Sequence, residues 1–140
     1  MALTYSVEDN RALVVAEGDF TFDDIQAAFS DVRSECADSE TFRILIVDHA
    51  SAFDPSEDEV RELAKFWGRL FRGVPTRIAL VVARELHYGI GRMIEVYARP
   101  TDFRFRVFRE EDEGRAWLDA APAQTSSDGS APSTQPASAG

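Results

Sequence analysis

Residues 42–71 read FRILIVDHASAFDPSEDEVRELAKFWGRLF, and this stretch carries the clearest structural signals of the chain. It opens with an unbroken apolar run, Ile44 to Val47, which is typical of a strand covered on both faces, as in a parallel sheet. A polar loop begins at Asp48. The stretch ends with apolar residues at helical spacing over three turns: Val60, Leu63, Ala64, Trp67, Leu70 and Phe71. It therefore predicts a strand, a loop and an amphipathic helix, which together form the repeating unit of an α/β sheet.

The start of this helix carries its own signals. Asp54 can accept hydrogen bonds as the N-cap, and Pro55 fits the first helical position. Glu57 lies three residues after Asp54, as a capping box requires. This interpretation leaves the hydroxyl of Ser56 in the first turn, near water.

The rest of the chain repeats the unit on both sides of the central stretch. The polar turn 8–11 separates two short strands, which predicts an antiparallel hairpin. Periodicity, capping signals and turn residues predict the following elements: strands 3–7 and 12–16, a helix from Thr21 to Cys36, a strand at 77–83, a helix at 87–98, a strand at 103–108 and a helix at 110–121. The order ββαβαβαβα predicts an α/β fold with one mixed sheet of about five strands and four helices.

Composition separates two regions. Residues 1–121 form the predicted domain, which is long enough for a hydrophobic core. From Pro122 the chain consists mainly of Ala, Ser, Thr, Pro, Gln and Gly, without apolar periodicity. Such a segment buries too little apolar surface to offset its ordering entropy, so residues 122–140 are predicted to be a disordered tail.

The charge and the apolar pattern limit the kinds of partner. The formal net charge of −10 argues against nonspecific binding of nucleic acid or anionic membranes, which attract clustered Lys and Arg. No apolar stretch approaches the roughly 20 residues of a membrane span, and no signal peptide is evident at residues 1–10. Cys36, the only cysteine, lies on an apolar helical stripe and is expected to be buried. We therefore expect a cytoplasmic location.

Several segments carry a family resemblance when they are taken in order: ILIVD followed by a capped helix, then RIALVVA, YGIGRMIE and FRVFREEDEGRAWL. Over roughly residues 3–121 the chain resembles the SpoIIAA-like branch of the STAS superfamily, whose fold is similar to that of CRAL-TRIO lipid-transfer domains. The most specific piece is the last segment. The resemblance implies a STAS-like fold and a bacterial, non-enzymatic regulatory or interaction module.

The resemblance also raises a phosphorylation hypothesis. In anti-sigma-factor antagonists of this superfamily, a serine at the start of the matching helix is phosphorylated by the partner kinase. Ser56 lies near that position, but Pro55 replaces the expected small polar residue. We therefore expect no stoichiometric phosphate at Ser56, and the antagonist mechanism is an alternative rather than the first choice.

Two groups of polar residues follow successive strands. Asp48, His49, Asp54 and Ser56 follow one predicted strand, whereas Glu85, His87 and Tyr88 follow the next. If these strands are parallel neighbours, both groups lie at one edge of the sheet. An Asp-His-Ser set could support nucleophilic chemistry, but neither a nucleophile elbow nor a glycine-rich oxyanion loop is present. Catalysis is therefore disfavoured, and we expect no enzyme activity.

Metal and cofactor binding are also disfavoured. His49 and His87 have no regular ligand spacing, so surface histidines in loops are the favoured interpretation. Gly89 and Gly91 do not complete a dinucleotide-binding fingerprint. We expect no metal and no cofactor.

Phe66, Tyr88 and Met93 are candidates for a different kind of site. Phe66 lies off the apolar stripe of its helix, and Tyr88 opens a helix softened by glycines. Packing against neighbours is the favoured interpretation of such residues. The alternative is that they line a pocket or a partner surface.

Two main functions remain. The first is binding of a protein partner or self-association through the acidic face Glu57, Asp58, Glu59 and Glu62. The second is binding of an apolar small molecule or lipid, entering near Phe66, Tyr88 and Met93. One enclosed apolar cavity beneath the helix that begins near Tyr88 would favour the second function, and a flat surface without a cavity would favour the first.

Overall fold

The computed structural model describes residues 3–36, 40–49 and 51–120. The predicted tail, residues 122–140, lies outside the described residues. The described elements follow the order ββαβαβαβα: β1 (Leu3–Glu8), β2 (Arg11–Ala16), α1 (Phe22–Glu35), β3 (Phe42–Asp48), α2 (Glu57–Leu70), β4 (Thr76–Val82), α3 (Glu85–Ala98), β5 (Phe103–Phe108) and α4 (Glu111–Ala120).

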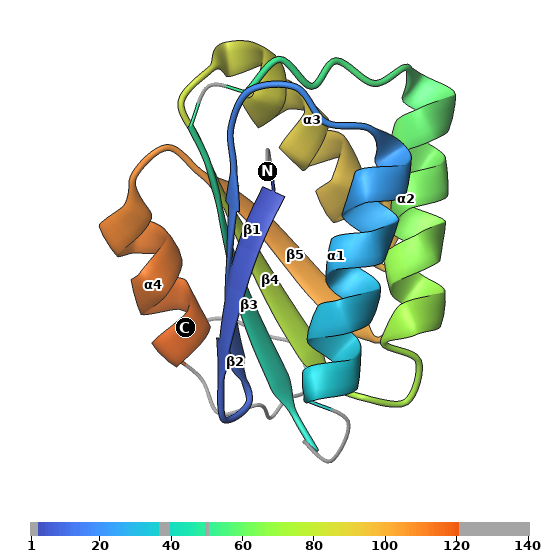
Figure 1. The fold of residues 1–140 in the computed structure, drawn as a ribbon, viewed down its shortest axis with the longest axis vertical. Coiled ribbons are helices and arrows are strands. Elements are labelled where there is room, and N and C mark those ends of the chain that lie inside the picture. The colour runs from blue at the N-terminus through green and yellow to red at the C-terminus, as the bar shows by residue number, and fades with distance from the viewer. Residues whose placement is uncertain (1–2, 37–39, 50, 121–140) are drawn as a thin grey trace.

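The five strands form one mixed sheet in the order β1-β2-β3-β4-β5. β1 is antiparallel to β2, and every later pair is parallel, which confirms the predicted α/β class. Because the parallel strands follow one another in a single direction, crossovers of one hand bring all their helices to the same face. Figure 1 shows α1, α2 and α3 on that face and α4 on the other.

The starts of α1 and α2 are set by side chains that accept hydrogen bonds from free backbone N–H groups. At α1, Thr21 and Asp24 form a capping box. At α2 the prediction was wrong: Ser56, not Asp54, is the N-cap, and Glu59 completes the box. In both D-P-S-E (residues 54–57) and S-E-D-E (residues 56–59), a glutamate follows the capping residue by three positions. The structure uses the second, so α2 starts two residues later than predicted.

α3 begins at Glu85, two residues before its predicted start. Its close packing on the sheet depends on Gly91, because an added Cβ there would lie 2.6 Å from Cβ and Cγ2 of Val107 on β5. Gly89 faces open space, since an added Cβ would meet nothing within 4 Å. Only one of the two glycines of α3 is therefore needed for packing.

The main core lies between the sheet and α1–α3. Trp67 of α2 is at its centre, with ring centroids of Phe29, Phe103 and Phe105 at 5.1, 6.1 and 5.6 Å. A smaller core on the opposite face, under α4, includes Leu45, Val81 and the fully buried Leu118. Cys36 is buried, as expected, and burial raises the pKa of its thiol.

Candidate functional site

The polar groups predicted at one sheet edge do come from neighbouring strands, because β3 and β4 are paired in parallel. At this edge Oδ2 of Asp48, the last residue of β3, lies 3.1 Å from Nδ1 of His87 in α3. The two residues are only 8% and 3% exposed. The prediction that His87 is a surface loop residue was wrong. Its place in the first turn of α3 turns the ring inward, toward the end of β3.

Ser51 completes the buried polar cluster and was not predicted. Its backbone N–H donates to Oδ1 of Asp48 at 2.8 Å, and its hydroxyl donates to Oδ2 at 3.2 Å. Arg84 donates to the carbonyl of Ser51 at 3.0 Å. Asp48 therefore fixes the loop after β3, because a buried carboxylate requires such partners. The spacing of Asp and Ser three residues apart was the available sequence signal.

The second nitrogen of His87 connects this cluster to Phe53. Nε2 lies 2.7 Å from the carbonyl oxygen of Phe53, and a carbonyl can only accept, so Nε2 carries the hydrogen. Nδ1 makes a close contact with Asp48 that falls short of hydrogen-bond geometry. Both ring nitrogens thus face oxygen atoms, which fixes the ring between β3 and the loop that leads to α2.

Two loops meet above this edge of the sheet. The rings of Phe20 and Phe53 are stacked with their centroids 4.9 Å apart and their planes 21° apart. The N–H of Ala52 donates to the carbonyl of Gly18 at 2.8 Å, which joins the same loops through their backbones. The only local signal for this pair is weak: a single phenylalanine lies within each of two polar loops.

A cavity of about 70 Å³ lies beneath this roof, between the sheet and the helices. Its walls are almost wholly apolar, and its polar lining comes from Asp48 and His87. The lining consists of Leu3, Val14, Ala16, Phe20, Ile25, Phe29, Ile46, Asp48, Phe53, Leu63, Trp67, Leu80, His87, Ile90 and Ile94. His87, Ile90 and Ile94 belong to α3, so this is an apolar cavity beneath the helix that carries Tyr88.

Trp67, one of the residues that line the cavity, carries an unsatisfied donor. The residue is 3% exposed, and its Nε1 has no hydrogen-bond partner among the described residues. Buried donors without acceptors are rare, because each loses its hydrogen bonds to water. An acceptor on a bound molecule or an ordered water would satisfy it.

The other predicted site residues lie outside the cavity lining. His49 and Asp54 are exposed, and Ser56 caps α2. Phe66 and Met93 are partly buried and pack against the main core. The guanidinium carbon of Arg109 lies 3.7 Å from the ring centroid of Tyr88, so Tyr88 contributes to a surface cation–π pair.

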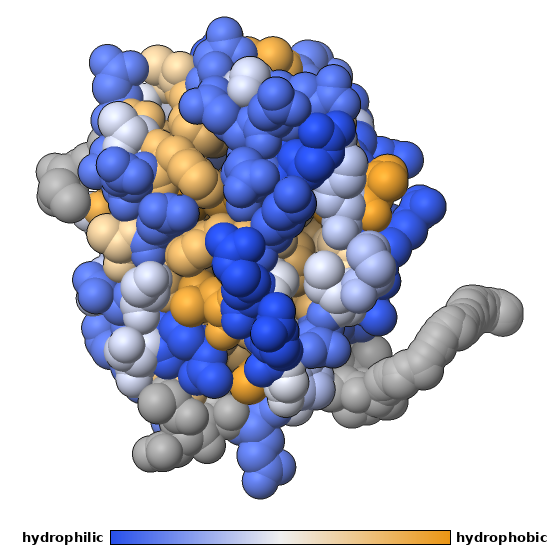
Figure 2. All heavy atoms as spheres, turned by 90° about the vertical axis from the view of Figure 1, so that its right-hand side faces the viewer, coloured by the Kyte–Doolittle hydropathy of each residue, from blue (hydrophilic) through white to orange (hydrophobic). Residues whose placement is uncertain are grey.

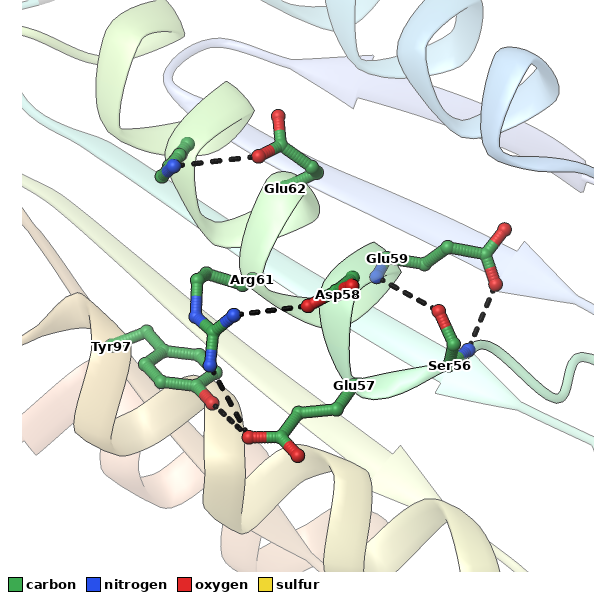
Figure 3. Close-up of polar contacts among 8 residues, drawn as sticks. Ser56, Glu57, Asp58, Glu59, Arg61, Glu62 and Tyr97 are labelled. Carbon is green, nitrogen blue, oxygen red and sulfur yellow. Dashed lines mark hydrogen bonds and ion pairs between the residues drawn. The ribbon is translucent and has the colours of Figure 1, made fainter.

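The acidic residues of α2 are largely paired within their own helix, as Figure 3 shows. Arg61 contacts Glu57 at 3.2 Å and Asp58 at 3.1 Å. Glu59 accepts from the backbone N–H of Ser56 at 2.8 Å, and Lys65 contacts Glu62 at 3.4 Å. Figure 2 shows the resulting band of hydrophilic residues, with apolar side chains on both sides of it. These pairs weaken the case for a partner surface at this face.

The Asp-His-Ser cluster lacks the arrangement of a hydrolase triad. In a triad the histidine bridges the carboxylate and the serine, with one nitrogen free to take the hydroxyl proton. Here both Ser51 and His87 contact Asp48, and Nε2 of His87 is bonded to Phe53. Ser51 is also fully buried. The cluster is therefore arranged to hold two loops and α3 together.

Comparisons with models of known protein families, with curated proteins and with solved structures found no match. Within residues 3–36, 40–49 and 51–120, no group of three or more His, Cys, Asp or Glu side chains could hold a metal ion. Among the helices that the structure describes, none is long and apolar enough to cross a membrane.

Proposed function

We propose that this domain binds a small, mostly apolar ligand in the cavity between the sheet and α1–α3. The observation that carries the proposal is the cavity itself, which has apolar walls and a few polar groups at defined positions. Natural ligand sites combine these two features. The resemblance to STAS-like and CRAL-TRIO-type domains supports the same proposal, because CRAL-TRIO domains transfer lipids.

The size of the cavity limits the ligand. An engineered cavity of about 150 Å³ binds benzene, and the cavity here measures about 70 Å³. The ligand is therefore a molecule of a few heavy atoms, or a larger molecule that inserts one short apolar end. Separation of the stacked rings of Phe20 and Phe53 would admit a larger ligand.

The indole N–H of Trp67 favours a ligand that carries a hydrogen-bond acceptor. A ketone, ether or ester oxygen would satisfy this buried donor, whereas a hydrocarbon would leave it without a partner. Asp48 and His87 already bond to the loop residues around them, so their capacity for a further contact is small.

Methyl NMR of the isoleucine and leucine residues during titration with 2-butanone tests binding. We expect saturable shifts at Ile46, Leu63 and Ile94, which line the cavity. Ile90→Phe adds volume at the cavity wall and should abolish the shifts. Val96→Phe, on the same helix at a position that is 49% exposed, is the matched control and should retain them. Shifts that do not saturate, or that persist in Ile90→Phe, would contradict the proposal.

Two ligands of similar size, one with and one without a hydrogen-bond acceptor, test whether the cavity prefers an acceptor. 2-Butanone carries an acceptor, and isopentane has a similar size without one. Trp67→Phe keeps an aromatic ring, smaller than the indole, and removes the N–H, so the preference for butanone should fall while isopentane binding persists. Native mass spectrometry of the purified protein would show in addition whether a ligand is already bound.

A further inference from the structure

Four arginines form a row across the sheet at one level. The strand register places Arg11 of β2 opposite Arg43, Arg43 opposite Arg77, and Arg77 opposite Arg104 of β5. On β3 and β4 the arginines precede, by two residues, the apolar side chains that pack under α4: Leu45 and Ala79. Since alternate residues of a strand share a face, the row lies on the α4 face of the sheet.

Two members of the row hold the end of α4. Arg11 forms an ion pair with Asp119. Arg77 donates to the carbonyl of Trp117 at 2.6 Å, and its guanidinium carbon lies 4.7 Å from the Trp117 ring centroid. Cations at a helix C-terminus are favourable, because the helix dipole is negative there.

The remaining arginines on this face have no carboxylate partner among the described residues. Among the described residues, Arg43, Arg104 and Arg106 form no ion pair. Arg104 donates to the carbonyls of Thr101 and Phe103, at 2.9 and 3.1 Å, and Arg106 lies 5.3 Å from the Phe108 ring centroid. Burial and the nearby charge of Arg43 lower the pKa of Arg77. On this face, the charges of Arg43, Arg104 and Arg106 are therefore not neutralised by a direct ion pair with any described residue, in a chain of net charge −10.

We propose that this arginine row is a docking surface for an acidic, extended segment of a protein partner. Guanidinium groups pair well with carboxylates, which gives the surface its charge complementarity. Neighbouring strands are about 4.8 Å apart, so the row spans about 14 Å, the length of four or five extended residues. The partly exposed ring of Trp117 offers an apolar contact beside the charges.

Two observations narrow the kind of partner. The net charge of −10 repels long polyanions such as nucleic acid, whereas a short acidic segment experiences less of that field. The outer edge of β5 is partly blocked, since Glu95 accepts from the N–H of Val107 at 2.9 Å and Phe103 accepts from Arg104. The segment therefore docks on the face of the sheet and does not add a strand to its edge.

Fluorescence anisotropy with labelled hexaglutamate tests the surface on the full chain. The triple variant Arg43→Gln, Arg104→Gln, Arg106→Gln keeps most of the side-chain volume and removes the charges. The matched control is Arg69→Gln, Arg72→Gln, Arg99→Gln, which removes three exposed arginines from the helical layer. Circular dichroism melting curves confirm that both variants fold.

We expect hexaglutamate to bind at about 20 mM salt and to weaken at about 200 mM, because screening reduces the attraction. The triple variant of Arg43, Arg104 and Arg106 should lose about tenfold or more in affinity, and the control should stay within about twofold. No binding at low salt, or equal losses in both variants, would overturn the proposal. Tighter binding of a single-stranded oligonucleotide than of hexaglutamate would overturn it as well, in favour of a nucleic-acid surface.

Discussion

Nδ1 of His87 lies 3.1 Å from Oδ2 of Asp48, and this contact joins the first turn of α3 to the end of β3 inside the protein. Asp48 also receives two hydrogen bonds from Ser51, and His87 is bonded to the carbonyl of Phe53. The pair therefore closes one end of the cavity and positions the loop that roofs it.

We expect Asp48→Ala to destabilise the fold by about 3 kcal/mol, because it leaves the buried donors of Ser51 without an acceptor and removes the close contact with His87. His49→Ala is the matched control, since the adjacent His49 is exposed and should change stability by less than about 0.5 kcal/mol. Urea unfolding measures both. A loss of unfolding free energy in Asp48→Ala no larger than that in His49→Ala would show that the cluster contributes little.

The order of elements and the apolar stripes were predictable, because each rests on a periodicity that spans many residues. Ile44 to Val47 and the stripe through Trp67 needed no tertiary information. The start of α2 was not predicted correctly, because Asp54 and Ser56 both offer a capping oxygen at compatible spacings. Local sequence alone did not decide between them.

The candidate site was predictable only in part, because it depends on how separate segments meet. The position of Asp48 and His87 at neighbouring strand ends followed from the parallel pairing. The stacked pair Phe20 and Phe53 joins loops that are far apart in the chain, and nothing local marks either residue. The arginine row likewise depends on strand register, which the sequence does not reveal.

The N-cap of α2 gives a direct test of its corrected start. Ser56→Ala removes the acceptor for the N–H of Glu59 and should cost about 1 kcal/mol. Asp54→Ala should be nearly neutral, because Asp54 is exposed and lies before the cap. Thermal unfolding of both variants measures the difference. A larger loss of stability in Asp54→Ala than in Ser56→Ala would favour Asp54 as the N-cap of α2.

Phosphorylation of Ser56 would act on the same cap. The hydroxyl of Ser56 accepts from Glu59, while the carboxylate of Glu59 lies 2.8 Å from the backbone nitrogen of Ser56. A phosphate would gain from the helix dipole but would repel Glu59 and its acidic neighbours. We expect phosphopeptide mapping of protein from its native host to show no stoichiometric phosphate there. Substantial modification would favour the anti-sigma-factor antagonist mechanism instead.

The two glycines of α3 should respond to alanine in opposite directions. Gly91→Ala places a methyl group 2.6 Å from Val107 and should destabilise by about 1–3 kcal/mol, because α3 must move away from β5. Gly89→Ala meets open space and should stabilise by about 0.5–1 kcal/mol, since alanine restricts the unfolded chain and favours helix. Paired denaturation curves measure both, and a shift of the same sign in the two variants would contradict the α3–β5 packing.

The ion pair of Arg11 and Asp119 should make the anchoring of α4 depend on pH. The hydrogen bond from Arg11 lowers the pKa of Asp119 in the folded state below its ordinary value. The stabilising contribution is therefore complete above the ordinary carboxyl pKa, and it disappears as the pH falls through the lowered folded value. The free energies of unfolding of the wild type and of Arg11→Gln should accordingly differ at neutral pH and converge in acid. Carboxyl-carbon NMR of Asp119 should show its midpoint rising toward the ordinary value in Arg11→Gln. A midpoint that does not move would mean that the pair does not form in solution.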